Sequence, residues 1–293
     1  MSTILITGAG GQLGQEFQAL APLYPSLRFI FAGQQTLDVT DGAAVARCFD
    51  QQALGGCINC AAYTAVDRAE SEPEQAWRAN AAAPQRLAQA CAQQGIPLIH
   101  YSTDYVYHSE QNTPFKEEDP TTPRSVYARS KLSGELAALE ANPLTMVIRT
   151  SWVYSRYGHN FVNTMLRLGR ERDRLQVVFD QIGTPTHARG LAAATLDILA
   201  KVQTGKMPPQ ALHGIFHYSD EGVCSWYDFA LAIFELAGID CHVTPIETKD
   251  YPTPAPRPPF SVLNKAKIKA AFGIEIKHWH QQLAEMLAAR QAD

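Results

Sequence analysis

A glycine-rich turn near the start of the chain constrains its fold more than any other feature. The apolar run from Thr3 to Thr7 predicts a buried strand, Gly8, Gly11 and Gly14 follow it, and a helical pattern begins there. Glycine is needed where a turn is tight and where backbone approaches a phosphate closely. The N-terminus of the next helix also offers free N–H groups to that phosphate. The turn therefore predicts a dinucleotide-binding α/β unit.

Strand and helix patterns alternate through the first half of the chain. Strands are expected at 3–7, 28–32, 57–61, 96–101 and 145–150, and helices near 12–21, 41–52, 73–94 and 125–141. Such alternation is typical of a parallel sheet covered by helices on both faces, and right-handed crossovers make it doubly wound. We expect an α/β fold with a doubly wound, Rossmann-type sheet over residues 1–150, joined by residues 181–205.

The second half is less regular and predicts a smaller C-terminal α/β domain for the substrate, made of residues 151–180 and 206–293. Helices are expected near 158–171, 188–203, 225–237 and 278–290, and strands at 175–179 and 215–219. The active site then lies in the cleft between the domains. The proline-rich segment 251–259 is either a stiff loop over a site or a simple linker, and composition leaves both open.

Composition and charge exclude several classes of function. The net charge is -4 without a basic stripe, so we expect no nucleic-acid partner. Apolar runs stay well below the roughly 20 residues of a membrane span, and no secretion signal precedes the first strand. The six cysteines are scattered and favour a reducing, cytoplasmic location. Cys57 and Cys60 have the spacing of a metal or redox pair, but they fall on a predicted buried strand and favour packing.

A tyrosine and a lysine form the candidate catalytic pair. Tyr127 and Lys131 lie one turn apart on one face of the helix predicted for 125–141. A nearby ammonium lowers the pKa of a phenol from its usual value of about 10, which suits proton transfer near neutral pH. Ser102, Thr103 and Asp104 end an earlier strand, and ligands bind at the carboxyl ends of the strands in such a sheet. We therefore predict that Tyr127 and Lys131 are catalytic beside this hydroxyl-bearing strand end.

These features together resemble the extended short-chain dehydrogenase/reductases. Longer stretches are similar to one family among them, the dTDP-4-dehydrorhamnose reductases. The stretches are residues 59–70, 102–107, 149–154 and 251–258. The resemblance runs from about residue 3 to residue 290 and covers nearly the whole chain.

The resemblance implies reduction of dTDP-4-dehydro-L-rhamnose to dTDP-L-rhamnose. NADPH would supply hydride to C4, with NADH as an alternative, and Tyr127 would donate the proton. Thr103 would complete the catalytic group, by a hydrogen bond to the reacting centre. It implies cofactor contacts at Gly8, Gly11, Gln12, Leu13, Gly14, Asp38, Val39, Ala62, Tyr63, Thr64, Tyr101, Tyr127 and Lys131. It implies substrate contacts at Thr103, Asp104, Tyr105, Trp152 and Arg257, with Arg257 on the diphosphate.

The choice of cofactor rests on residues 33–35, which follow the second predicted strand. They contain neither an acid to repel a 2′-phosphate nor a basic residue to bind one, unless Arg28 or Arg47 reaches the site. We therefore expect the chain to use both cofactors, with a modest preference for NADPH.

One departure concerns metal. Some relatives carry a glutamate for a magnesium-linked dimer where this chain has Arg189, and an arginine cannot ligate a cation. We therefore predict no metal site and leave a homodimer open. Asp67 and Glu70 favour a solvated helix start over a metal site. Two other functions also stay open: a different sugar-nucleotide reductase or epimerase of the superfamily, and a non-catalytic regulatory subunit.

Overall fold

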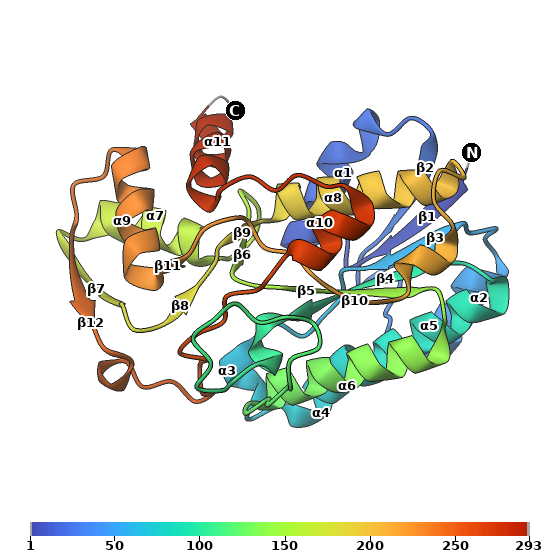
Figure 1. Cartoon of the computed structure of the whole chain (residues 1–293), viewed down its shortest axis with the longest axis horizontal. Helices are drawn as coiled ribbons and strands as arrows, with labels where there is room; N and C mark the ends of the chain where they lie inside the picture. Colours follow the sequence, from blue (N-terminus) through green and yellow to red (C-terminus); the bar gives the residue numbers. More distant parts are fainter. Residues whose placement is uncertain (1, 292–293) are drawn as a thin grey trace.

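The computed structural model describes residues 2–291 and is built around one six-stranded parallel sheet (Figure 1). The strands are arranged in the order β10-β5-β4-β3-β1-β2. They are β1 (Ser2–Thr7), β2 (Leu27–Ala32), β3 (Gly56–Asn59), β4 (Leu98–Thr103), β5 (Thr145–Thr150) and β10 (Gly214–His217). The predicted α/β fold with a doubly wound parallel sheet is confirmed.

Helices cover both faces of this sheet and enclose two apolar cores. One face carries α1 (Gln12–Leu20), α8 (Ala188–Gln203) and α10 (Ala266–Phe272). The other carries α2 (Gly42–Asp50), α5 (Ala83–Gln94) and α6 (Val126–Ala141). Strands buried on both faces read as continuous apolar runs, which is why the sequence located them well. No helix among residues 2–291 is both long and apolar enough to cross a membrane.

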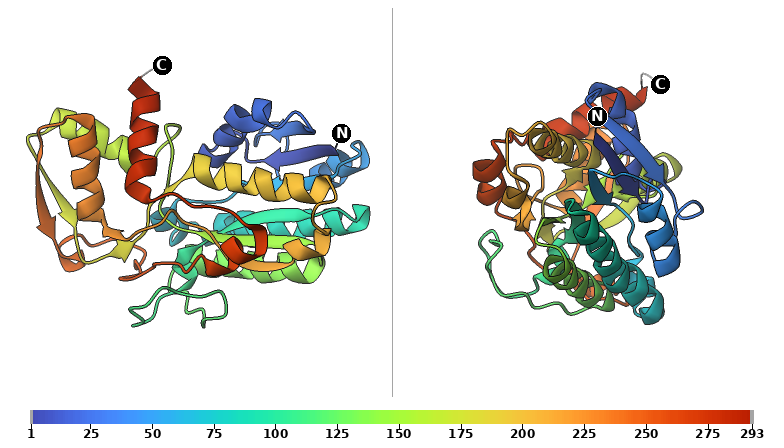
Figure 2. Two further views of the ribbon diagram at one scale, coloured as in Figure 1. Left: turned by 45° about the horizontal axis from the view of Figure 1, so that its top comes forward. Right: turned by 90° about the vertical axis from the view of Figure 1, so that its right-hand side faces the viewer.

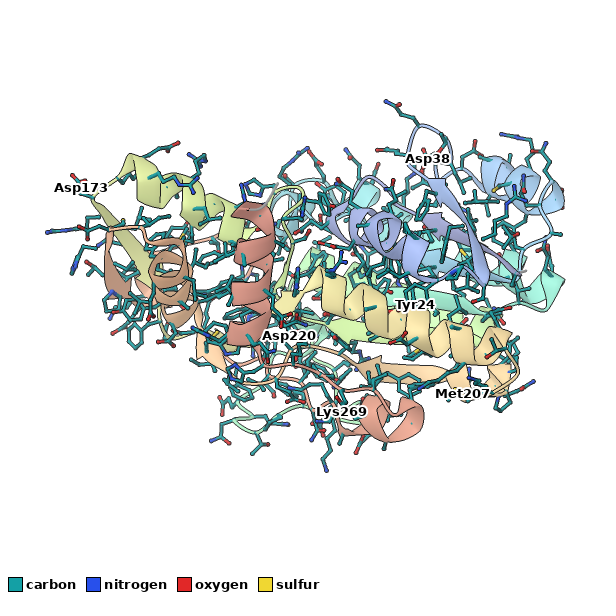
Figure 3. The ribbon with its side chains drawn as sticks, turned by 90° about the horizontal axis from the view of Figure 1, so that it is seen from above. Tyr24, Asp38, Asp173, Met207, Asp220 and Lys269 are labelled. Atoms are coloured by element: carbon teal, nitrogen blue, oxygen red, sulfur yellow. The ribbon has the colours of Figure 1, made fainter. Side chains whose placement is uncertain are left out.

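A second unit with its own apolar core packs beside the sheet. It contains α7 (Phe161–Glu171), α9 (Trp226–Ala237), α11 (Trp279–Gln291), β7 (Arg174–Val178) and β12 (His242–Ile246). The N-terminus, where β1 begins, lies at the end of the sheet remote from this unit (Figures 1 and 2). The parallel strands therefore run toward the second unit, and their carboxyl ends face it. Asp38 lies in the part of the molecule that contains the sheet, and Asp173 lies at the end of the second unit farthest from the sheet (Figure 3).

Short strands link the sheet to the second unit. They are β6 (Val153–Tyr154), β8 (Ile182–Gly183), β9 (Thr186–His187) and β11 (Cys224–Ser225). β6 pairs with β9, and β8 pairs with β11. These two-residue strands, together with β12 and α10, carry too little periodicity to be found in the sequence.

The two-domain division stays a prediction, but one boundary needs correction. The sequence placed residues 206–293 in the substrate domain, whereas β10 pairs with β5 at the edge of the large sheet. α10 also packs on the core of the sheet, through Ile268 and Phe272. The chain thus returns from the second unit to the large sheet, and the order of elements in the sequence does not show this.

The helix predicted for 73–94 is interrupted. It divides into α4 (Pro73–Trp77), a π-helical turn η2 (Arg78–Ala82) and α5. Pro84 has no N–H to offer the carbonyl of Asn80, and the Ala83 N–H instead donates to Arg78 O, five residues back. The freed carbonyl faces α6, where a Cβ on Gly134 would lie 1.9 Å from Asn80 O. The π turn therefore lets η2 and α6 approach closely.

A buried ion pair fixes α6 on the sheet. The guanidinium of Arg149 on β5 donates to both carboxylate oxygens of Glu135 on α6, with Nη2 2.6 Å from Oε2. The side chains are 2% and 0% exposed. Arg149 Nη1 also donates to the Tyr107 hydroxyl at 2.6 Å, and that hydroxyl lies 2.9 Å from Nε2 of His217 on β10.

We predict that Glu135→Gln lowers the free energy of unfolding by roughly 3 kcal/mol, because it leaves the Arg149 charge buried without a counter-ion. Denaturant unfolding measures the loss. The matched control is Glu171→Gln, which breaks the exposed pair with Arg167 and should cost less than about 1 kcal/mol. Equal stability of Glu135→Gln and the native chain would show that the pair does not hold α6.

Candidate active site

The glycine turn after β1 has the geometry of a phosphate-binding loop. Gly8 has a φ of +64°, and a Cβ there would lie 2.5 Å from Ala61 N. A Cβ on Gly14 would lie 2.5 Å from Gly8 O, so both positions require glycine. Gly11 caps α1 without a side chain, which leaves the N–H groups of the first turn open to an anion.

The other two residues predicted in this turn are held by neighbours. Gln12 begins α1, and its Oε1 accepts from Asn160 Nδ2 at 2.8 Å. The Leu13 side chain packs against the core between α1 and the sheet, so only its backbone is available for the pyrophosphate. The turn can therefore contact a pyrophosphate through its backbone N–H groups and not through these two side chains.

Asn59, at the carboxyl end of β3, links three neighbouring strands of the sheet. Its Oδ1 accepts from the Thr7 hydroxyl at 2.7 Å and from Ala61 N at 3.1 Å. Its Nδ2 lies 3.1 Å from Nδ1 of His100 on β4. The sequence singled out Asn59 only as part of a family stretch, because its partners are 52 and 41 residues away.

The three predicted catalytic residues meet at the carboxyl end of β4. The Thr103 hydroxyl hydrogen-bonds with the Tyr127 hydroxyl and lies 3.1 Å from Asp104 Oδ1. Lys131 Nζ donates to the carbonyl oxygen of Tyr101 at 2.5 Å. The Tyr101 ring, predicted to contact the cofactor, points instead into the core, where its hydroxyl lies 2.8 Å from Thr195 Oγ1. Tyr101 therefore serves the site through its backbone.

The pKa of Tyr127 differs from the sequence prediction. Burial of the hydroxyl raises it to about 12, the Thr103 hydrogen bond opposes that rise and the Asp104 carboxylate adds to it. The prediction that Lys131 lowers this pKa is wrong here, because the ammonium is directed at a carbonyl oxygen rather than at the phenol. A phenol with this pKa is protonated at neutral pH, so Tyr127 holds the proton that a general acid must donate.

Two neighbouring groups titrate close to neutrality. Burial lowers the pKa of Lys131 to about 8, although Glu135 favours its charged form. Burial raises the pKa of Asp104 to about 7, against hydrogen bonds from Ser261 and Thr103. Perturbed groups gathered at one strand end are typical of a catalytic centre.

The predicted substrate residues lie on the same edge. Asp104 and Tyr105 begin a 3-10 turn directly after β4. The Tyr105 and Tyr127 rings meet edge to face, with centroids 5.8 Å apart. The Arg257 guanidinium lies 6.0 Å from the centre of the Tyr105 ring. Trp152 follows β5 by two residues and is half-buried.

The proline-rich segment is an ordered loop fastened to the site. Arg257 Nη2 donates to Asp67 Oδ2 at 2.8 Å, and Ala255 N donates to Asp67 Oδ1 at 3.2 Å. Ala255 is fully buried. These contacts decide between the two interpretations of residues 251–259 in favour of a stiff loop over the site.

Asp67 and Glu70 are more than a solvated helix start. Both follow β3, in and after the short helix α3 (Val66–Ala69). Asp67 holds the loop of Arg257, and Glu70 Oε1 accepts from Val126 N at 2.8 Å, which caps the first turn of α6 one residue before Tyr127. The sequence missed both contacts because the partners are 190 and 56 residues away.

A cavity of about 390 Å³ occupies the predicted adenosine side of the cofactor site. It is lined by Gln34, Asp38, Thr40, Tyr63, Gln75, Arg78 and Ala79. Hydrogen bonds from the backbone and the hydroxyl of Thr40 lower the pKa of Asp38. The expected contact at Val39 has its side chain in the core, and Ala62 and Thr64 lie exposed on either side of Tyr63.

Arg78 is a cation that the sequence analysis of cofactor choice did not consider. The sequence offered only Arg28 or Arg47 as a cation for this region, and neither lines the cavity. Arg78 reaches it from the π turn η2, with Nη2 3.3 Å from Thr40 Oγ1. Arg78 lies more than forty residues after the end of β2. The residues that directly follow β2 therefore give no indication of this cation in the sequence.

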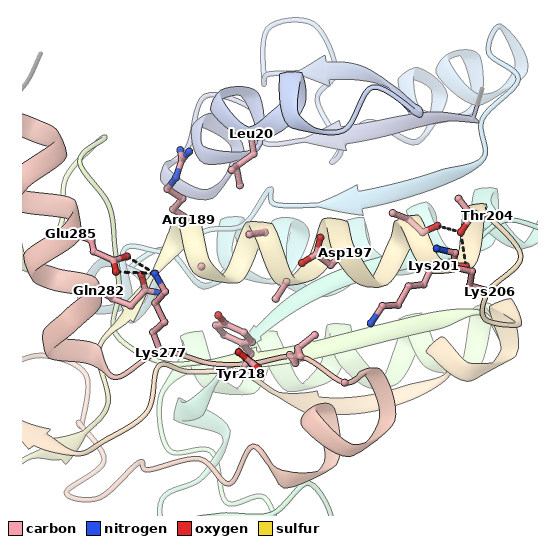
Figure 4. Close-up of a pocket in the computed structure, with 17 residues that line it drawn as sticks. Leu20, Arg189, Asp197, Lys201, Thr204, Lys206, Tyr218, Lys277, Gln282 and Glu285 are labelled. Carbon is pink, nitrogen blue, oxygen red and sulfur yellow. Dashed lines mark hydrogen bonds and ion pairs between the residues drawn. The ribbon is translucent and has the colours of Figure 1, made fainter.

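A separate cavity of about 630 Å³ runs along α8 and contains none of the predicted site residues (Figure 4). Arg189 stands at one end of it, and its Nη1 lies 3.6 Å from Glu16 Oε2. Among residues 2–291, no group of three or more acidic, histidine or cysteine side chains is arranged to hold a metal ion.

A glycine turn, an ordered Thr–Tyr–Lys group and a doubly wound sheet define a short-chain dehydrogenase/reductase. The chain matches the family model described as "RmlD substrate binding domain" over residues 1–292. It is 41% identical to the dTDP-4-dehydrorhamnose reductase of Sinorhizobium fredii, over 98% of this chain and 97% of that protein. The chain belongs to the dTDP-4-dehydrorhamnose reductase family.

Solved structures agree with this assignment. A dTDP-4-dehydrorhamnose reductase from Clostridium acetobutylicum is 40% identical, with a TM-score of 0.92 and 99% of each chain covered. The reductase from Bacillus anthracis, solved in complex with NADP, is 33% identical, with a TM-score of 0.91 over 99% of this chain and 100% of that one.

We predict that Lys131 titrates with a pKa of about 8. The charged ammonium is then present below about pH 8 and is lost as the pH rises above that value. Any role that needs the charge is lost over the same range of pH. ¹³C NMR of lysine Cε measures the midpoint, and Lys131→Arg identifies the resonance by removing it. Exposed lysines such as Lys249 serve as the internal control. A midpoint above about 10, the value of an ordinary lysine, would contradict the prediction.

Proposed function

We propose that this chain reduces dTDP-4-dehydro-L-rhamnose to dTDP-L-rhamnose with NADPH. The observation that carries the proposal is the meeting of Thr103, Tyr127 and Lys131 at the carboxyl end of β4. Membership of the family and the NADP complex of the Bacillus anthracis relative support the same reaction. NADH remains a second cofactor in this proposal.

The chain's own residues would orient and protonate the substrate. The nicotinamide would supply a hydride to the sugar C4, and the carbonyl electrons would move to its oxygen. Tyr127 would then donate its hydroxyl proton to that oxygen, while Thr103 holds the phenol by its hydrogen bond. Lys131 would bind the nicotinamide ribose with its ammonium, and the open N–H groups of α1 would bind the pyrophosphate.

Arg257 would bind the diphosphate of the sugar nucleotide. Its guanidinium is already paired with Asp67, and the Tyr105 ring lies beside it. A guanidinium carries five donors, so it can keep one carboxylate bond and still bind phosphate oxygens. Asp67 would thus orient Arg257 rather than compete with the substrate. The free, mostly buried cysteines support the cytoplasm as the place of the reaction.

We predict that Tyr127→Phe lowers kcat by roughly 10²–10⁴-fold while NADPH binding survives, because only the proton donor is removed. Loss of nicotinamide absorbance with the dTDP-keto-sugar measures kcat, and titration measures binding. Tyr24→Phe is the matched control, since it removes a hydroxyl that bonds Asp197 at 2.8 Å outside the site. Turnover of Tyr127→Phe at the native rate would remove Tyr127 from the mechanism.

The cofactor preference gives a second test. We predict that Arg78→Ala lowers kcat/KM for NADPH roughly tenfold and leaves NADH nearly unaffected, because a cation that faces the 2′-phosphate is lost. Arg47→Ala on α2 is the matched control and should change neither value. If Arg47→Ala lowers NADPH use instead, the cation has been assigned to the wrong helix.

A further inference from the structure

Trp152 has a strained backbone at the edge of the active site. Its φ is +47°, and no other residue apart from glycine among residues 2–291 has a positive φ. A bulky aromatic residue rarely adopts this conformation, and such strain persists only where the surroundings impose it. The residues around Trp152 must therefore hold it in this conformation.

Two residues from distant parts of the chain fix the indole ring. The ring of Trp226 stacks on it, with centroids 3.5 Å apart and planes within 9°. On the Gly183 side, an added Cβ would lie 2.6 Å from the ring atom Cε2. Only glycine therefore leaves room for the ring in this position.

Both supports are themselves rigid. Gly183 on β8 pairs with Cys224 on β11, two residues before Trp226. Trp226 is the first residue of α9, whose start is fixed by a capping box between Ser225 and Asp228. The second unit thus presents one preset surface to Trp152.

The register of the sheet places this stack beside the catalytic residues. Thr103 and Thr150 are paired across β4 and β5, and Trp152 lies two residues beyond Thr150. The ring is half-buried, so part of it remains open. Its place at this edge follows from the strand pairing and not only from family resemblance.

We propose that Gly183 and Trp226 are positioning residues that set the Trp152 ring as a fixed wall for the keto-sugar. The strained backbone is the consequence of holding the ring where the substrate meets it. The inference rests on the proposed function, because it names what orients a substrate contact of that site.

Far-UV circular dichroism tests the stack without substrate. Two indoles stacked this closely give an exciton couplet, which we expect in the native chain and in Trp77→Phe, a control that removes an exposed tryptophan of α4. The couplet should disappear in both Trp152→Phe and Trp226→Phe. A couplet that survives in Trp226→Phe would overturn the stack.

Binding tests the positioning role. Trp226→Phe and Gly183→Ala should each weaken binding of dTDP-L-rhamnose on the order of 10–100-fold, while NADPH affinity changes less than about twofold. The two variants act from opposite sides of the ring, and retained NADPH binding shows that each has folded. Native affinity for dTDP-L-rhamnose in both would overturn the inference. The proposed function is tested by a different result. It fails if the native chain does not oxidise NADPH in the presence of the dTDP-keto-sugar.

Discussion

The buried pair of Arg149 and Glu135 fixes the helix on which the whole site depends. α6 carries Tyr127 and Lys131, and a shift along its axis would move both away from the end of β4. The ion pair holds its middle against β5, the bond from Lys131 to Tyr101 O holds it against β4, and Glu70 caps its first turn. These contacts act at three heights on one helix, so they set its position and its rotation together.

The segment after β3 joins the parts of the site that sequence separates. Asn59 links the glycine turn to β4, Asp67 holds the loop of Arg257, and Glu70 caps the catalytic helix. One short stretch of chain, residues 59–70, therefore contacts the glycine turn, the loop of Arg257 and the helix of Tyr127. A change in this stretch would disturb binding and chemistry at once, although none of the three side chains is proposed to react.

Local patterns were enough to place five of the six strands in the sheet and to bring Tyr127 and Lys131 onto one helix, and distance in the sequence explains what they missed. Buried parallel strands are continuous apolar runs, and the Tyr127–Lys131 spacing lies within one helix, so both were visible. The Asp67–Arg257 pair, the entry of Arg78 and the stack on Trp152 each join segments that only the fold brings together. The pKa of Tyr127 was predicted in the wrong direction because burial and the aim of the Lys131 ammonium are tertiary properties.

Transfer of isotope tests the central claim, that this geometry delivers hydride to C4 of a dTDP-keto-sugar. The chain is incubated with dTDP-4-dehydro-L-rhamnose and NADPH that carries deuterium at both C4 positions of the nicotinamide, and the product is read by NMR. The account predicts dTDP-L-rhamnose with one deuteron at the sugar C4. Deuterium at another carbon, or oxidation of NADPH without this product, would contradict it.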